Sequence, residues 1–334
     1  MIEPIVSREQ VRYTGRFDFS QPEGPQFAWS GSSIAISFKG TEVRALLKPV
    51  QSGMADNWVN IVIDDQEPVP VKIDKENSYL LALNLANEVH TVEIFKRTEP
   101  MVGELQFMGF ELPEGAELLE PPSRHEHKIE IIGDSITAGY GNEAASIEDG
   151  FQASQENHYL AYGPIAARSL NAELIALAWS GKGMYQNYGG VRDIQMPELY
   201  RRTLPSRSES SWDFHSRVPD VVVINLGTND FSVDTIDPSQ YVAEYKRFVE
   251  FIRTNYPDAH LFCTIGPMNR KPAEFIEGIV SELNRAGDER IYFYEFPPQN
   301  VEKNGVGGDW HPSLKTHAIM AELLAAEIKN KLGW

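Results

Sequence analysis

Four short segments in the C-terminal two-thirds of the chain carry the residue types that acyl transfer requires. They read Gly-Asp-Ser-Ile-Thr at 133–137, Trp-Ser-Gly-Lys-Gly at 179–183, Gly-Thr-Asn-Asp at 227–230 and Asp-Trp-His-Pro at 309–312. The serine offers a nucleophile, the histidine a general base, and the glycine amide and asparagine side chain offer N–H donors for an oxyanion. Four such segments in this order indicate a serine hydrolase, where one alone would be weak evidence.

The elements that must position these segments read as alternating strands and helices from residue 128 onward. Near-continuous apolar stretches, typical of parallel strands covered on both faces, occur at 129–132, 174–178, 221–226, 261–265 and 291–294. Helical patterns between and after them are clearest at 239–255, 273–286 and 312–332. In the last helix, Pro312 is expected at the first position and Gly333 just beyond the end. The pattern predicts a doubly wound α/β domain, which binds ligands beyond the carboxyl ends of its strands.

The first 112 residues predict a different fold, an all-β sandwich that is most simply a jelly roll. We expect about eight short strands and no helix of any length. The clearest strands are at 34–38, a turn at Lys39-Gly40 and then 43–47, followed by 58–63, 69–73, 89–95 and 104–112. Pro70 places its strand at an edge or a strand start. Residues 113–127, rich in proline and acidic residues, are predicted to be a linker, which leaves 128–334 as the α/β domain.

The order and the residue sequences of the four segments resemble those of the SGNH (GDSL-like) hydrolases over roughly residues 128–334. The resemblance implies that Ser135 is the nucleophile, that Gly181 and Asn229 join the Ser135 N–H in the oxyanion hole, and that His311 is the general base. Gly181 is preferred to Gly183 because the second block of that family matches Ser-Gly. The common ending of the family is Asp-x-x-His-Pro, and here Gly308 stands at the position of that aspartate.

The aspartate nearest the histidine is Asp309, two residues before His311. This shorter spacing, the N-terminal β domain and the Ser-Gly-Lys-Gly run look like carbohydrate esterase family 2, whose members remove acetyl groups from plant polysaccharides. Residues two apart in an extended segment face the same side, so Asp309 is predicted to complete a triad by accepting from His311 Nδ1–H. The alternative is that Asp309 caps the last helix and a backbone carbonyl orients the ring.

Other residues of the blocks have simpler interpretations. Asp134 and Asp230 are expected to hold their loops by accepting backbone N–H bonds. Trp310, between Asp309 and His311, is predicted to be an exposed stacking platform for a sugar ring, and Trp212 is a second candidate for substrate binding.

We therefore predict a serine esterase that removes O-acetyl groups from acetylated plant oligosaccharides and polysaccharides, such as xylan or glucomannan fragments. The reaction passes through an acetyl-serine intermediate and needs no metal and no organic cofactor. One rival is a lipase- or thioesterase-like hydrolase of another small ester. A rival from a different class is a protein that mainly binds carbohydrate. The loop at 142–158 is too polar to suggest a lipase lid.

Composition limits the partners of the chain. Its 334 residues carry a formal net charge of −18, which argues against nucleic acid and anionic membranes. The single cysteine, Cys263, lies in an apolar stretch and is expected to be a buried strand residue. Met1 to Tyr13 has no signal-peptide pattern, so a cytoplasmic location is expected, or a secreted one if a signal sequence was removed. An oligomer of identical chains is left open.

Overall fold

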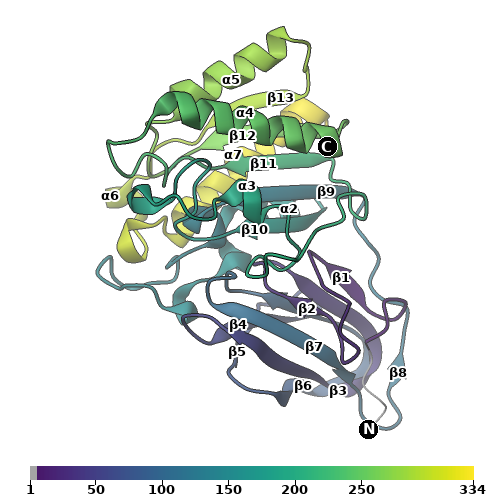
Figure 1. Ribbon diagram of the computed structural model, residues 1–334. Coiled ribbons are helices and arrows are strands. Elements are labelled where there is room, and N and C mark those ends of the chain that lie inside the picture. The colour runs from purple at the N-terminus through teal and green to yellow at the C-terminus, as the bar shows by residue number, and fades with distance from the viewer. Residues whose placement is uncertain (1–5) are drawn as a thin grey trace. The chain divides into compact units, whose positions relative to one another are not determined.

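The computed structural model describes residues 6–334, apart from the side chains of Gln51 and Ser52. The first five residues, part of the segment used above to predict the absence of a signal peptide, lie outside this range. Two compact units emerge, one formed by Met1–Arg124 with Thr203–Ser210 and the other by His125–Arg202 with Ser211–Trp334 (Figure 1). The first boundary falls inside the predicted linker, whereas the assignment of Thr203–Ser210 to the N-terminal unit was not predicted.

The N-terminal unit is an antiparallel β structure, as predicted. Its strands are β1 (Arg12–Thr14), β2 (Gln26–Phe27), β3 (Ser33–Ser52), β4 (Asn57–Ile63), β5 (Val69–Ile73), β6 (Asn77–Lys96), β7 (Gly103–Glu111) and β8 (Glu117–Leu118). They form one eight-stranded sheet in the order β2-β7-β3-β6-β4-β5, and β1 and β8 also pair with β3. The proline-bearing β5 is at the end of this order, as expected of an edge strand.

Two predictions for this unit were wrong in detail. The chain does not turn at Lys39-Gly40, because β3 continues for 20 residues and absorbs the irregularity as a register shift against β6 between Gly40 and Glu42. The segment predicted as a linker also contains β8, which pairs with β3 at Phe38 and Lys39. The two 20-residue strands β3 and β6 thus replace the shorter strands that the sequence suggested.

The segment Thr203–Ser210 is attached to the N-terminal unit by a buried charge. Glu104 on β7 is 1% exposed, and its carboxylate accepts from Arg207 at 2.6 Å and from the Ser206 hydroxyl. The same guanidinium donates to the side-chain oxygen of Gln26 at 2.8 Å. A buried carboxylate needs such partners, because an unpaired one costs several kcal/mol.

The second unit is a five-stranded parallel sheet between helices, which confirms the predicted α/β class. Its strands are β9 (His127–Gly133), β10 (Ala172–Ala178), β11 (Val221–Asn225), β12 (His260–Ile265) and β13 (Ile291–Glu295), in the order β10-β9-β11-β12-β13. Its helices are α1 (Ser135–Ala138), α2 (Tyr162–Ser169), α3 (Met196–Leu199), α4 (Pro238–Asn255), α5 (Ala273–Arg285), α6 (Val301–Asn304) and α7 (Leu314–Leu332).

Helices cover both faces of this sheet (Figure 1). Helices α2 and α7 pack together over a core that includes Ile129, Val221 and Leu324, while α4 packs with α5. Cys263 on β12 is fully buried, as predicted. Helix α7 begins two residues later than expected, because Ser313 is its N-cap and Pro312 precedes the cap. Gly333 ends it in the left-handed conformation. None of the helices in residues 6–334 combines the length and apolarity that a bilayer crossing requires.

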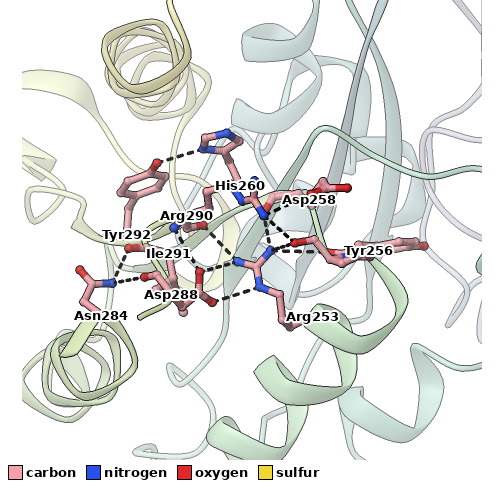
Figure 2. A network of polar contacts seen from close by, with 11 residues as sticks. Arg253, Tyr256, Asp258, His260, Asn284, Asp288, Arg290, Ile291 and Tyr292 are labelled. Carbon is pink, nitrogen blue, oxygen red and sulfur yellow. Dashed lines mark hydrogen bonds and ion pairs between the residues drawn. The ribbon is translucent and has the colours of Figure 1, made fainter. Parts of the chain in front are cut away.

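The edge of the sheet where the strands begin is held by a polar network around Arg253, in the last turn of α4 (Figure 2). Its guanidinium donates to both carboxylate oxygens of Asp288, at 3.0 Å each. It also donates, at 2.6–3.3 Å, to the main-chain carbonyls of Tyr256, Pro257, Ala259 and Arg290. These carbonyls belong to the turns that lead into β12 and β13, so one side chain ties the end of α4 to two strand starts.

This network predicts a stability effect without a functional one. The substitution Arg253→Met should lower the free energy of unfolding by about 2–3 kcal/mol, because partly buried carbonyls and the Asp288 carboxylate lose their donor. Urea unfolding would measure the loss, and esterase turnover should not change. The control is Arg247→Met on the same helix, where a 65%-exposed side chain pairs with Glu244 and the cost should stay below about 0.5 kcal/mol. Equal losses for the two variants would contradict the assignment.

Candidate active site

The nucleophile candidate Ser135 is the first residue of α1, directly after β9. Asp134 caps this short helix by accepting from the Ile136 N–H at 3.0 Å, so Ser135 itself is not the cap. A side chain at Gly133 would lie 2.0 Å from Thr137 Oγ1, which means that only glycine allows so tight a passage from strand to helix. The strand order reverses between β9 and β11, and Ser135 therefore stands at the switch point where such folds bind ligands.

His311 lies next to Ser135 although 176 residues separate them in the chain. Its Nε2 is 2.8 Å from Ser135 Oγ, and its Nδ1 is 3.1 Å from the carbonyl oxygen of Gly308. A carbonyl only accepts, so Nδ1 carries the ring proton and Nε2 is left to accept from the serine hydroxyl. This is the tautomer that a general base requires. The ring of Tyr140 also stacks on the imidazole, with 4.2 Å between ring centroids.

The expected hydrogen bond between Asp309 and His311 Nδ1 is wrong. The carboxylate of Asp309 is exposed and accepts instead from the Tyr140 hydroxyl at 2.6 Å. Asp309 lies in a 3₁₀ turn, Gly308–Trp310, with φ of 47°, so the extended geometry assumed for two residues on one side does not apply. Nor does it cap α7, since Ser313 accepts from the Thr316 N–H. Of the alternatives, the backbone carbonyl is the group that orients the ring.

The surroundings of His311 set its basicity. Burial lowers the pKa of His311 below its ordinary value, and the Gly308 carbonyl and the negative charge of Asp309 act in the opposite direction. Asp309 thus influences the imidazole through its charge and its backbone, while its carboxylate makes no hydrogen bond to the ring. The ring stays neutral, and able to take a proton, at pH values below those at which a free imidazole would already be charged.

Gly181 and Asn229 are on the two loops that flank Ser135. Gly181 has a φ of 77°, a left-handed value that favours glycine, and its carbonyl accepts from Tyr188 N at 2.8 Å. The side-chain amide of Asn229 donates to the Lys182 carbonyl at 2.9 Å and to Asp134 Oδ2 at 3.2 Å. Asn229 therefore joins the loop after β10 to the cap of α1. That it also donates to an oxyanion, with the N–H groups of Gly181 and Ser135, stays a prediction.

The two aspartates of the blocks hold loops, as expected. Asp134 caps α1, and Asp230, fully buried, accepts from the backbone N–H groups of Met184, Tyr185 and Gln186 at 2.7–3.0 Å. The neighbouring Gly183 has no room for a side chain, because a Cβ would lie 2.6 Å from the Asp230 carboxylate. Gly183 is thus required by packing, and Gly181 is the glycine whose surroundings are open.

The two tryptophans predicted to bind substrate differ in exposure. Trp310 is 56% exposed with a φ of 64°, and its carbonyl accepts from the Gln299 side chain at 2.8 Å. Trp212 is half-buried in the loop after α3, where its amide donates to the Arg201 carbonyl. The substrate-binding roles predicted for both tryptophans stay predictions. Tyr188, beside Gly181, is 68% exposed.

The sequence interpretation missed Gly308, Tyr140 and Tyr188. The signal for Gly308 was present, because glycine stands where the common pattern has the triad aspartate, but its carbonyl was not singled out. Tyr140 left no signal, since its contacts with Asp309 and His311 arise only when distant loops meet. Tyr188 lies in the same loop as Gly181 and was not singled out. Within residues 6–334, no three histidine, cysteine, aspartate or glutamate side chains are grouped so that they could hold a metal ion.

The geometry defines a class of protein independently of the order of the blocks. The serine follows the first strand of a parallel sheet with the order 2-1-3-4-5, and it is paired with a histidine just before the last helix. A glycine and an asparagine flank this pair. This is the arrangement of the SGNH hydrolases.

Comparison with known proteins agrees with this class. Residues 131–319 match the profile of the GDSL-like lipase/acylhydrolase family, and residues 13–122 match the carbohydrate esterase 2 N-terminal domain. A family two carbohydrate esterase from Clostridium thermocellum, solved in complex with cellohexaose, superposes with a TM-score of 0.92 at 45% identity, over 97% of this chain and 99% of that one. This chain belongs to carbohydrate esterase family 2.

Two curated relatives add context. Cellulase/esterase CelE of Acetivibrio thermocellus is 46% identical over 337 residues, which cover 99% of this chain and 40% of the relative. The chain thus spans about two fifths of that protein's length. An acetylxylan esterase / glucomannan deacetylase of Cellvibrio japonicus is 30% identical over 328 residues, covering 94% of this chain and 88% of the relative.

The contacts of His311 predict that the Gly308 carbonyl matters more for catalysis than the Asp309 carboxylate. Asp309→Asn should keep at least about a tenth of the wild-type kcat, because the Gly308 carbonyl still holds the ring, whereas His311→Ala should lose at least about 10³-fold. The acid limb of kcat/KM should already lie below about pH 6.5 in the wild type. Asp309→Asn should move it lower still, since a lost negative charge disfavours the imidazolium.

Measured pH–rate profiles on an acetyl ester would check this prediction. Tyr140→Phe is the matched control, because it removes the hydrogen bond to Asp309 but keeps both the carboxylate charge and the stacked ring. A loss of two orders of magnitude in Asp309→Asn, with Tyr140→Phe unaffected, would restore the triad.

Proposed function

We propose that the chain hydrolyses O-acetyl esters on plant oligosaccharides and polysaccharides of the xylan or glucomannan type. The observation that carries the proposal is the 2.8 Å contact between Ser135 Oγ and His311 Nε2, at the switch point of the parallel sheet. The names of the relatives support the substrate class, since one is an acetylxylan esterase / glucomannan deacetylase.

The mechanism follows from the tautomer of His311. Ser135 Oγ attacks the acetyl carbonyl carbon while Nε2 takes the hydroxyl proton, and the negative charge that develops on the carbonyl oxygen is stabilised by N–H donors. In our proposal these donors are the N–H groups of Ser135 and Gly181 and the amide of Asn229. The intermediate then expels the sugar oxygen, which receives the proton from Nε2.

The second half of the reaction repeats these steps with water. His311 takes a proton from a water molecule, whose oxygen attacks the acetyl-serine, and the collapse returns the proton to Ser135 Oγ and releases acetate. In the tetrahedral intermediate of each half, while Nε2 holds the transferred proton, the ring is an imidazolium. Its stabilisation comes from the Gly308 carbonyl at Nδ1 and from the nearby charge of Asp309.

The exposed aromatic residues favour a carbohydrate over a lipid. Trp310 offers an open indole face beside His311, which suits the apolar face of a sugar ring. The Clostridium thermocellum relative, a family two carbohydrate esterase, was solved in complex with cellohexaose, which supports a carbohydrate ligand for this chain. The predictions of a cytoplasmic location, of no nucleic-acid or membrane partner and of an open oligomeric state stay predictions.

The nucleophile can be tested by Ser135→Ala. The variant should have no measurable turnover of acetylated xylan or p-nitrophenyl acetate, while its unfolding free energy should stay within about 1 kcal/mol of the wild type, because a small side chain is exchanged next to the active-site opening. Measuring cellohexaose binding by the same variant distinguishes an esterase from a protein that mainly binds carbohydrate. Full binding by the variant, together with a wild-type chain that has no esterase activity, would indicate a carbohydrate-binding protein. Full esterase activity in Ser135→Ala would contradict the mechanism.

The acyl group can be tested by chain length. We expect kcat/KM to fall steeply from acetyl to butyryl and octanoyl esters, because the loop at 142–158 is polar and offers no apolar lid. Acetic acid release from acetylated xylan and glucomannan, followed in parallel, checks the polymer substrate. Octanoyl esters cleaved as fast as acetyl esters would replace this proposal by a lipase-like function.

A further inference from the structure

Two fully buried histidines that take no part in the steps above lie against the elements that carry Ser135 and His311. His158 is in the 3₁₀ turn His158–Leu160, and its Nδ1 is 3.0 Å from the carbonyl oxygen of Thr137, two residues after Ser135. His317 is in the first turn of α7, six residues after His311, and its Nδ1 is 3.3 Å from the backbone nitrogen of Tyr162.

These contacts connect three helices. The Tyr162 hydroxyl lies 2.9 Å from Thr137 Oγ1, so Tyr162 reaches α1 through its side chain and α7 through its backbone. The first N–H groups of a helix need acceptors, and the cap residue of α2, Ala161, has no side chain that could supply one. His317 takes this role for Tyr162. The chain of contacts runs from the serine helix through α2 to the helix that follows the histidine base.

The partners determine the tautomers of both rings. A carbonyl only accepts, so His158 carries a proton on Nδ1. A backbone N–H only donates, so His317 accepts at Nδ1 and carries its proton on Nε2. Protonation of His317 at Nδ1 would place two N–H groups against each other. The contact with Tyr162 therefore exists only while His317 is neutral.

The surroundings keep His317 neutral. Burial, with smaller contributions from positive charge on His158 and His311, lowers the pKa of His317 to about 3. The titratable groups that face it are His158 from the 3₁₀ turn, Tyr162 from α2 and His311 from the segment before α7. Because the interaction is mutual, a charge on His317 would oppose the imidazolium that His311 becomes in every turnover.

We propose that His158 and His317 are positioning residues of the esterase, which hold α1 and the start of α2 against α7 and so fix Ser135 Oγ relative to His311 Nε2. The kinetic part of this proposal rests on the proposed function. Neither residue touches the reacting atoms, so their effect belongs to the chemical step and not to substrate affinity.

The tautomers can be tested without any activity. Two-bond ¹H–¹⁵N spectra of the histidine rings in the wild-type chain should show a protonated Nδ1 on His158 and a neutral Nε2–H ring for His317 that does not titrate between pH 5 and 8. Spectra of His158→Asn and His317→Asn assign them. A His158 ring without a proton on Nδ1, a His317 ring with one on Nδ1, or protonation of His317 in this range would overturn the proposal whether or not the chain is an esterase.

The kinetic test uses a pair of substitutions with the same number of side-chain heavy atoms. His317→Leu removes the acceptor for Tyr162 N–H, while His317→Asn can supply one through Oδ1. With p-nitrophenyl acetate, the leucine variant should lose at least about tenfold in kcat with KM changed less than about twofold, and the asparagine variant should stay within about threefold of the wild type. Thermal unfolding of each variant is measured alongside.

The outcomes distinguish a positioning role of His317 from a role in the stability of the fold alone. A folded leucine variant with full kcat, or leucine and asparagine variants that are equally slow, would overturn the proposal. Should His317→Leu fail to fold, the pair His158→Leu and His158→Asn gives the same comparison, because the asparagine amide can donate to the Thr137 carbonyl. A wild-type chain with no turnover of any acetyl ester would instead refute the proposed function and leave the test of the tautomers standing.

Discussion

The hydrogen bond from His311 Nδ1 to the Gly308 carbonyl is the interaction on which the site depends. A carbonyl can orient a ring only if its own backbone is rigid. Here Gly308 N donates to the Gly141 carbonyl at 2.9 Å, Asp309 N to Ile147 at 3.0 Å, and Gly307 N to the His311 carbonyl at 2.8 Å. A Cβ on Gly307 would lie 2.5 Å from the Gly141 carbonyl oxygen. The loop after α1 and the loop before α7 thus fit each other through glycines, which lets the backbone do what a carboxylate side chain does in a triad.

Orientation of the ring by a carbonyl avoids the desolvation of a carboxylate but requires an unfavourable backbone conformation. A buried carboxylate beside His311 would have to be desolvated, whereas a neutral carbonyl is already part of the backbone. The cost appears instead in conformation, because Asp309 and Trp310 both have positive φ values, 47° and 64°. Such values cost of order 1–3 kcal/mol for residues other than glycine. The same geometry turns Asp309 toward Tyr140 and leaves Trp310 exposed, so the orientation of the base and the exposure of this tryptophan have a common origin.

How far the sequence predicts this structure depends on whether a feature is local. The apolar strands, the end of the last helix before Gly333 and the meeting of three blocks at one sheet edge follow from periodicity and from the carboxyl-edge rule, and the structure confirms them. The Asp309 contact could not be predicted, because the spacing argument needs an extended segment and the chain makes a 3₁₀ turn there. The bulge at Gly40 and the stacking of Tyr140 on His311 depend on partners far away in the chain. His158 and His317 showed no pattern at all, since a buried histidine and an exposed one look alike in sequence.

The connectivity of the two units has a consequence for how the chain can be divided. The backbone passes from one unit to the other three times, after Arg124, after Arg202 and after Ser210. An excised fragment that begins at His125 would carry Thr203–Ser210 without Glu104 and Gln26, and an N-terminal fragment ending at Arg124 would bury Glu104 without Arg207. The N-terminal unit therefore completes its interior only after residue 210 has been synthesised. Although this unit comes first in the chain, it cannot complete its folding during synthesis before the second unit has begun to emerge.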